Sequence, residues 1–292
     1  MKNILVTGAN KGIGFAIVER ILEEADDTYV FLGSRDSGRG EAAVDKLLQA
    51  HADFTNRIEM LEIDVSSDES VQRAAEIVRS QCADDGLYGI VNNAGIGFGS
   101  SDLSSVLNVN TRGIHRICAA FIPLLIDGGR IVNITSAAGP NFVAKCGPNK
   151  QAFFTNANVT WNEIDALMKE CVSIAGDTAA FTANGLADGS PYGLSKALAN
   201  SCTLQLAREN PNLIINACTP GYIATDLTVH SEEDRRKNPE ELGMKSPREG
   251  ANSAIFLLFG ESLGSGHYYG SDAQRSPLDH YRAPGSPPYS GD

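Results

Sequence analysis

Tyr192 and Lys196 lie four positions apart in the stretch SPYGLSKAL, residues 190–198, which begins like a helix with a proline in its first turn. At this spacing both side chains project from one helical face, with β-carbons about 5–6 Å apart. A phenol has an ordinary pKa of about 10, and a fixed ammonium beside it favours the phenolate and lowers that value. The pair therefore predicts a general acid or base; the alternative is a solvated face that carries both residues by chance.

Two further polar residues precede this pair in the chain. Ser136 follows the apolar run 131–134, so its hydroxyl is expected at the carboxyl edge of a sheet, where it can bond a substrate carbonyl. Asn110 falls in the helical stretch before that run. It is either an ordinary polar helix residue or the holder of a water that links Lys196 to solvent. The five histidines are isolated, no C-x-x-C pair occurs among the six cysteines, and G-x-S-x-G is missing, so neither a metal site nor an esterase is expected.

The glycine-rich turn TGANKGIG, residues 7–14, follows the first apolar run and opens a helix. Glycines let the backbone approach a pyrophosphate, and the helix N-terminus supplies free amides and partial positive charge. The pattern is Gly-x3-Gly-x-Gly rather than the commoner G-x-G-x-x-G. It predicts a dinucleotide-binding turn; the alternative is an ordinary turn between a strand and a helix.

The end of the second strand indicates which dinucleotide binds. In NAD-binding folds an acidic side chain there bonds the ribose 2′-hydroxyl. Here Ser34 and Arg35 stand in that place, with Lys11 and Arg39 nearby and Asp36 partly offsetting their charge. A guanidinium attracts a 2′-phosphate through charge-assisted hydrogen bonds. NADP is therefore favoured over NAD.

Two other segments end strands at the same expected edge. The run Asn92–Gly95, which reads NNAG, follows the fourth strand, and its small residues suit close passage of a ribose; the alternative is a helix-capping Asn. Asp64 ends the third strand, where it either faces an adenine or caps the next helix.

The elements that must position these residues alternate along the chain. Near-continuous apolar strands indicate a parallel sheet covered by helices on both faces, an α/β fold. The length allows one large domain or two. Strands are expected at 4–6, 29–32, 58–63, 87–91, 130–135, 213–218 and 268–269, and helices near 12–25, 39–51, 67–82, 102–125, 192–209 and 247–259.

Two segments break this alternation. Residues 137–190 form an insertion, which we expect to be loop with one or two helices, because Thr160 and Glu163 fit a capping box. Residues 271–292 are rich in Ser, Pro and Gly and predict an irregular, partly disordered tail.

Composition narrows the class of protein. The net charge of −12 argues against nucleic acid as a partner. No apolar stretch approaches the roughly 18 residues that span a bilayer, and the N-terminus is no signal peptide. Scattered cysteines favour reduced thiols and a cytoplasmic location.

Together these features resemble the short-chain dehydrogenase/reductase family. The shared motifs are TGANKGIG, NNAG, Asn110, Ser136, Tyr192-x3-Lys196 and Pro220-Gly221, in family order over residues 4 to about 260. The glycine turn, the segment Ser34-Arg35-Asp36 with Arg39, and the long insertion look like the NADPH-dependent carbonyl reductase group.

The resemblance implies one Rossmann-like, doubly wound parallel sheet in the order 3-2-1-4-5-6-7, within a single domain over residues 1–292. It implies Tyr192 as proton donor, Lys196 as the residue that lowers its pKa and binds ribose, Ser136 orienting the carbonyl, and Asn110 organising a relay water. The cofactor contacts implied are Gly8, Asn10, Lys11, Gly12, Ile13, Gly14, Ser34, Arg35, Arg39, Asp64, Val65, Asn92, Ala94, Gly95, Tyr192, Lys196, Pro220, Gly221, Ile223 and Thr225.

The resemblance also implies a substrate lid at about 222–246. Helices on either side of the serine strand build the interface of family tetramers, and the insertion would cover that surface, so a monomer is expected. The function expected is NADPH-dependent reduction of a ketone, aldehyde or quinone carbonyl. The alternatives are NAD-linked alcohol oxidation and a catalytically silent, NADP-binding regulatory protein.

Overall fold

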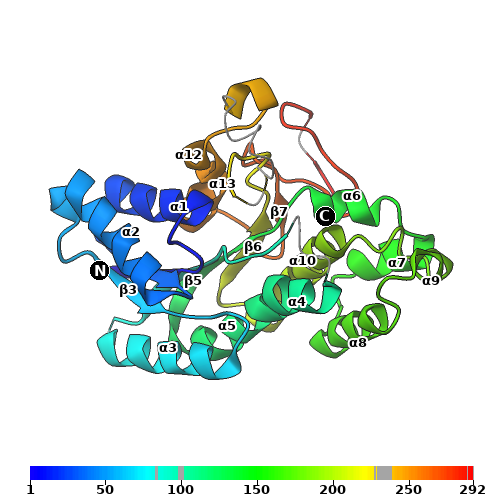
Figure 1. Ribbon diagram of the computed structural model, residues 1–292, viewed down its shortest axis with the longest axis horizontal. Coiled ribbons are helices and arrows are strands. Elements are labelled where there is room, and N and C mark those ends of the chain that lie inside the picture. Colours follow the sequence, from blue (N-terminus) through cyan, green and yellow to red (C-terminus); the bar gives the residue numbers. More distant parts are fainter. Residues whose placement is uncertain (83–84, 98–101, 227, 229–238, 288, 292) are drawn as a thin grey trace.

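A computed structural model describes residues 1–82, 85–97, 102–226, 228, 239–287 and 289–291 of the chain (Figure 1). Within these residues one parallel sheet has the strand order β3-β2-β1-β4-β5-β6-β7, which confirms the predicted topology. The strands are β1 (Lys2–Val6), β2 (Thr28–Ser34), β3 (Ile58–Glu62), β4 (Leu87–Asn92), β5 (Leu125–Ile134), β6 (Ile214–Cys218) and β7 (Tyr268–Tyr269).

The sheet separates two hydrophobic cores. Successive side chains of a strand point to opposite faces, so in β1 Leu5 packs into one core while Ile4 and Val6 pack into the other. In β2, Phe31 and Leu32 divide in the same way. All five of these side chains are at most 1% exposed, as expected of a parallel sheet covered on both faces.

Helices cover the two faces of the sheet (Figure 1). One face carries α1 (Gly12–Glu24), α2 (Ser37–Ala50), α12 (Pro247–Gly250) and α13 (Asn252–Phe259). The other carries α3 (Asp68–Gln81), α4 (Leu103–Leu107), α5 (Gly113–Phe121) and α10 (Pro191–Glu209). Short 3-10 turns lie at Ala52–Phe54, Ile122–Leu124 and Pro239–Leu242. No helix in the described part of the chain is long and apolar enough to cross a membrane.

The helix expected over 102–125 is not uniform. A π-helical turn, Asn108–Arg112, separates α4 from α5. Such turns insert an extra residue into the helix and occur frequently at functional sites. This one contains Asn110, whose side chain is buried toward α10.

The insertion is more helical than the sequence predicted. Where one or two helices were expected, residues 137–190 contain α6 (Ala138–Val143), α7 (Pro148–Phe154), α8 (Trp161–Ser173) and α9 (Thr178–Ala183). The capping box of Thr160 and Glu163 opens α8 as predicted. The other three helices have six or seven residues and carry too few periodic apolar positions to be recognised in the sequence.

The structure bears on two predictions for the C-terminal part of the chain, the substrate lid at about 222–246 and the irregular tail at 271–292. Of the expected lid, residues 227 and 229–238 lie outside the described residues. The tail contains no helix or strand among its described residues, as expected, but it folds back onto the carboxyl edge of the sheet: Tyr269 and Arg275 form an antiparallel bridge, and Ser276 N–H donates to the Tyr268 carbonyl at 2.9 Å.

Candidate active site

Tyr192 and Lys196 lie in the first turns of α10, which begins with Pro191 at its first position. The Lys196 Nζ is 5.6 Å from the centroid of the Tyr192 ring, and it donates a hydrogen bond to the carbonyl of Ile134 at 2.9 Å. Lys196 is 5% exposed. The structure therefore brings the two groups together as their spacing predicted, with the ammonium fixed against the carboxyl end of β5.

Burial governs the protonation of this pair. It lowers the pKa of Lys196 from 10.5 to about 8. It also raises the pKa of Tyr192 above 10, an effect that a hydrogen bond with Ser136 only partly offsets. The expected lowering of the Tyr192 pKa is therefore not found in the protein by itself, because desolvation of the phenol is the largest effect on that pKa.

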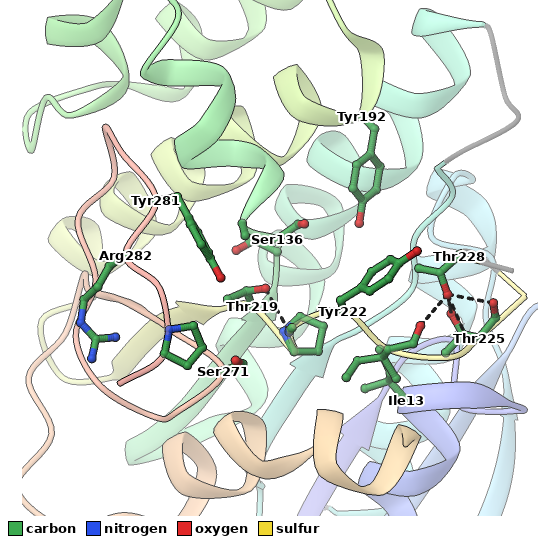
Figure 2. A pocket seen from close by; sticks show the side chains of 16 residues that line it. Ile13, Ser136, Tyr192, Thr219, Tyr222, Thr225, Thr228, Ser271, Tyr281 and Arg282 are labelled. Carbon is green, nitrogen blue, oxygen red and sulfur yellow. Dashed lines mark hydrogen bonds between the residues drawn. The ribbon is translucent and has the colours of Figure 1, made fainter. Parts of the chain in front are cut away.

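Ser136 lies just beyond the end of β5, between that strand and α6. Its hydroxyl accepts a hydrogen bond from the Ala138 N–H at 3.1 Å, and it is hydrogen-bonded to the Tyr192 phenol. Both side chains line the same cavity (Figure 2). Two hydroxyls of different acidity thus face one space, an arrangement that can hold a carbonyl oxygen.

Asn110 is fully engaged with the protein. Its carboxamide donates to the Ile96 carbonyl at 2.7 Å and to the Ser195 hydroxyl at 3.0 Å, and it accepts from the Ile96 N–H at 2.9 Å. A side chain on Gly95 would come within 3.3 Å of the Asn110 Oδ1 and 3.6 Å of the Lys196 Nζ. Asn110 therefore ties the loop after β4 to α10 beside Lys196.

The glycine turn has the backbone that its sequence predicted. Gly8 has φ of 62° and Gly12 has φ of 60°. A Cβ on Gly8 would lie 2.8 Å from the Ala94 Cα, and one on Gly14 would lie 2.5 Å from the Gly8 carbonyl oxygen. Only glycine fits at these positions, and Ala94 lies against the turn. Thr225, near the start of the expected lid, packs beside Gly12.

Asn93 is a site residue that the sequence analysis did not select. Its amide donates to the carbonyls of Thr7 and Gly8, both at 3.0 Å, and so holds the glycine turn in place. Asn92, selected instead, is buried and donates to the Asn133 Oδ1 at 2.9 Å within the core. Adjacent positions of a strand end point to opposite sides, a signal available in the sequence that distinguishes the two.

The three cations expected near a 2′-phosphate are not equivalent. Lys11 pairs with Asp226 at 2.6 Å, and Arg39 pairs with Asp36 at 3.2 Å. Within the described part of the chain, Arg35 forms no ion pair and is exposed. Ser34 is buried, and its hydroxyl donates to the Asp36 carbonyl at 2.8 Å. Arg35 is therefore the cation best placed to meet a phosphate.

Asp64 and Val65 follow the third strand and make local contacts. The Asp64 carboxylate accepts from the Ser66 N–H at 2.9 Å and from its hydroxyl at 2.6 Å. Ser67, and not Asp64, is the N-cap of α3. Val65 is buried against Gly113. The alternative that Asp64 caps the next helix is therefore wrong, and its bonds to Ser66 form an Asx turn. The alternative that Asp64 faces an adenine stays a prediction.

A cavity of about 220 Å³ lies between the glycine turn and the hydroxyls of Ser136 and Tyr192 (Figure 2). Its wall includes Ile13 from the glycine turn, Ser136 and Tyr192, and the segment expected on the nicotinamide side. The residues lining it are Ile13, Thr135, Ser136, Ala137, Tyr192, Thr219, Pro220, Gly221, Tyr222, Ile223, Thr225, Thr228, Ser271, Tyr281, Arg282 and Pro284.

Four of these residues, Ser271, Tyr281, Arg282 and Pro284, come from the C-terminal tail. The sequence analysis did not predict any of them, because Ser-, Pro- and Gly-rich composition indicates disorder. The signal available was an aromatic and an arginine side by side, with an aspartate ten positions before the arginine to pair with it.

Comparisons with known proteins identify the family of the chain. The family model described as short chain dehydrogenase matches residues 2–148. The chain is 32% identical over 271 residues to carbonyl reductase (NADPH) 1 of Homo sapiens, covering 87% of this chain and 89% of that protein. It is 31% identical over 266 residues to carbonyl reductase (NADPH) 3 of Rattus norvegicus, with the same coverage.

Solved structures share the fold. Salutaridine reductase from Papaver somniferum matches with a TM-score of 0.75 at 23% identity, over 92% of this chain and 99% of that one. Menthone neomenthol reductase from Mentha piperita matches with a TM-score of 0.74 at 22% identity, over 92% and 98%. With a family model matching half of its residues and relatives above 30% identity along most of its length, the chain belongs to the short-chain dehydrogenase family.

Proposed function

We propose that this protein is an NADPH-dependent reductase of ketones, aldehydes or quinones, with Tyr192 as the proton donor. The observation that carries the proposal is the convergence of Tyr192 and Ser136 on one cavity that Ile13 of the glycine turn also lines, with the buried Lys196 Nζ 5.6 Å from the centroid of the Tyr192 ring. The names of relatives such as carbonyl reductase (NADPH) 1 support the choice of reaction and cofactor.

The residues present fit a dinucleotide phosphate. Gly8 and Gly12 have the positive φ of a tight glycine turn, and the turn leads into the N-terminus of α1, where free amides favour anions. Arg35 would meet the 2′-phosphate, and Ile13 and the segment Pro220–Thr225 would border the nicotinamide half. When bound, NADPH supplies a hydride from C4 of its nicotinamide to the carbonyl carbon.

The protonation of Tyr192 suits the reductive direction. Because burial raises the pKa of Tyr192 above 10, the phenol holds its proton at neutral pH and can donate it to the carbonyl oxygen. Ser136 holds the same oxygen by a hydrogen bond. Lys196 then stabilises the phenolate left behind, since a nearby cation favours the charged form. The raised pKa supports reduction over NAD-linked oxidation.

We infer that a proton returns to Tyr192 through Lys196 and a water near Gly95. Support comes from Asn110, which fixes the Ile96 backbone beside the Lys196 Nζ and has its own donors satisfied by protein. In this role Asn110 shapes the space for the water and does not touch the substrate.

We also propose that the protein is a monomer in the cytoplasm. The insertion packs on the helices that precede and follow the serine strand. Asp165 of α8 accepts from Arg112 at 2.7 and 3.1 Å, Trp161 stacks on His115 at 3.6 Å, and Arg208 of α10 donates to the Val159 carbonyl at 2.7 Å. These contacts support a covered surface that is not free for a second copy. Light scattering during size-exclusion chromatography should give one chain per particle, near 31.0 kDa.

The function is tested by NADPH consumption with 1,4-naphthoquinone, acetophenone, benzaldehyde and propanal. Turnover of at least one of them, with the matching alcohol or hydroquinone as product, is expected. Tight NADPH binding without turnover of any panel member would overturn the catalytic assignment and favour the silent, NADP-binding alternative.

A further inference from the structure

The C-terminal tail forms one wall of the carbonyl cavity. In Figure 2 Tyr281 and Arg282 lie on one side of the cavity, and Ile13, Thr225 and Thr228 lie on the other, while Ser136 and Tyr192 approach between them. The expected cofactor contacts Ile13 and Thr225 lie across the cavity from Tyr281, and Gly221 packs against Ser271 at the base of the tail. Tyr281 is therefore placed on the side of the cavity away from the glycine turn.

An ion pair between the buried Arg282 and the partly buried Asp272 holds the tail in this position. Both ends of the Arg282 guanidinium donate to the Asp272 carboxylate, at 2.8 and 3.1 Å. The same guanidinium donates to the carbonyls of Ser286 at 3.0 Å and Pro287 at 3.1 Å. The Arg282 side chain is only 6% exposed. A bidentate pair with this many added bonds is geometrically specific, and it closes residues 272–287 into one loop.

The base of this loop is attached to the protein core. The Gly270 N–H donates to the Gln274 carbonyl at 2.9 Å, and the Ser253 hydroxyl of α13 donates to the Gly270 carbonyl at 2.8 Å. Gly221, on the nicotinamide side, has φ of 93°, and a Cβ there would lie 3.1 Å from the Ser271 Cβ. The tail is thus packed against the cavity from its first residues onward.

Tyr281 is adjacent to Arg282 of the Arg282–Asp272 ion pair, but it remains accessible to solvent. Its side chain is 47% exposed, although Arg282 beside it is buried. The cavity wall also carries Tyr222, which is 55% exposed, and the catalytic candidate Tyr192. Two accessible rings, with Pro220, Ile223 and Pro284, make a wall that favours flat or cyclic apolar groups, because aromatic faces pack well against such surfaces.

We propose that Tyr281 is a specificity-determining residue whose ring packs against an aromatic or alicyclic carbonyl substrate, and that the Arg282–Asp272 pair is the device that positions it. This inference rests on the proposed carbonyl reductase function. It names the substrate class of the same site and gives the C-terminal tail a role in recognising it.

The first test removes the ring. Tyr281→Ala should lower kcat/KM for 1,4-naphthoquinone and acetophenone roughly 10-fold, mainly through KM, because a lost packing contact weakens ground and transition states alike. The kcat/KM for propanal should change by no more than about twofold, because propanal has no ring that packs against Tyr281. Tyr281→Phe, which keeps the ring, should retain the wild-type preference.

Tyr289→Ala is the matched control. Tyr289 is another tail tyrosine; its ring lies 6.0 Å from the Arg275 guanidinium and does not line the cavity. This variant should keep wild-type kinetics. A uniform loss for all substrates in Tyr281→Ala, or an equal loss of preference in Tyr289→Ala, would overturn the assignment of Tyr281.

The second test weakens the Arg282–Asp272 ion pair without mutating Tyr281. Asp272→Asn should raise KM for the ring-bearing substrates a fewfold, leave kcat for propanal near wild type, and leave the NADPH Kd unchanged. A thermal unfolding curve for each variant shows whether the variant is folded. A folded Asp272→Asn protein with wild-type KM values would overturn the positioning role of the pair.

These outcomes are separable from failure of the proposed function. If the wild-type protein reduces no member of the panel, the function itself fails. If it reduces the panel and Tyr281→Ala leaves the ratio of kcat/KM values for naphthoquinone and propanal unchanged, only the inference about the tail fails.

Discussion

The Lys196 ammonium lies 5.6 Å from the centroid of the Tyr192 ring and is buried with no carboxylate among the groups that shift its pKa. Its hydrogen bond to the Ile134 carbonyl, at 2.9 Å, is a dipole interaction and does not neutralise the charge. The protein therefore keeps a desolvated cation beside a phenol, an arrangement that costs stability and that a site for stabilising phenolate requires.

Replacing Lys196 by Met should stabilise the protein at pH 7 while it abolishes turnover. Lowering the pKa from 10.5 to about 8 corresponds to roughly 3 kcal/mol at most, less the lost bond to Ile134, so a gain of about 1–2 kcal/mol is expected. Between pH 8 and 10.5 the unfolded chain binds more protons at Lys196 than the folded one, so wild-type stability rises there. The gain should therefore shrink between pH 7 and pH 9.5 in urea unfolding; a variant less stable than wild type at pH 7 would contradict this account.

Arg35→Glu should shift cofactor preference toward NADH. A hydrogen bond to a charged group contributes about 1.5–3 kcal/mol, so the ratio of NADPH to NADH kcat/KM should fall roughly 10- to 100-fold. Arg39→Ala is the comparison, and it should have a smaller effect because Arg39 is paired with Asp36. An unchanged ratio in Arg35→Glu would show that another group selects the cofactor.

Gly8→Ala should weaken NADPH binding and destabilise the protein by about 1–3 kcal/mol, because the residue has positive φ and its Cβ would lie 2.8 Å from the Ala94 Cα. Gly128→Ala is the matched control: its φ is 76°, and a Cβ there meets nothing within 4 Å. It should cost only about 1 kcal/mol and leave the NADPH Kd unchanged. Equal effects of the two variants on the NADPH Kd would contradict the proposal that the glycine turn binds the dinucleotide.

Asp165→Asn should weaken the attachment of the insertion. Partial burial raises the pKa of Asp165, but hydrogen bonds from Lys169 and Arg112 outweigh it, and the pKa is lowered below its ordinary value of 3.8. The pair therefore stabilises the fold above that value, and this contribution is lost as the pH falls through the lowered pKa. We expect a loss of about 1 kcal/mol at pH 7, discounted for exposure, and a difference that narrows toward pH 3 in urea unfolding.

The sequence was sufficient to predict the sheet and the reacting groups. The alternating apolar runs and helices predicted a parallel sheet covered on both faces, and the family resemblance supplied its strand order. The glycine turn was recognisable because Gly8 and Gly12 adopt a conformation that other residues avoid. The i,i+4 spacing of Tyr192 and Lys196 indicated that they share a helical face, since α10 fixes their relation locally, and the accompanying motifs favoured the pair as catalytic.

The remainder depended on contacts between distant segments. The raised pKa of Tyr192 results from the burial of its phenol, which the i,i+4 spacing does not report. Asn93 was missed because its partners, Thr7 and Gly8, are far away in the chain. The tail was assigned by composition, which does not reveal that the buried Arg282 pairs with Asp272.

The most direct measurement is single-turnover reduction of 1,4-naphthoquinone by Tyr192→Phe protein preloaded with NADPH. The account predicts a rate roughly 100- to 10,000-fold below wild type, because the positioned proton donor is removed, with an NADPH Kd within about twofold, because the glycine turn and Arg35 hold the dinucleotide. A rate equal to wild type at unchanged NADPH affinity would show that the Tyr192 phenol does not deliver the proton.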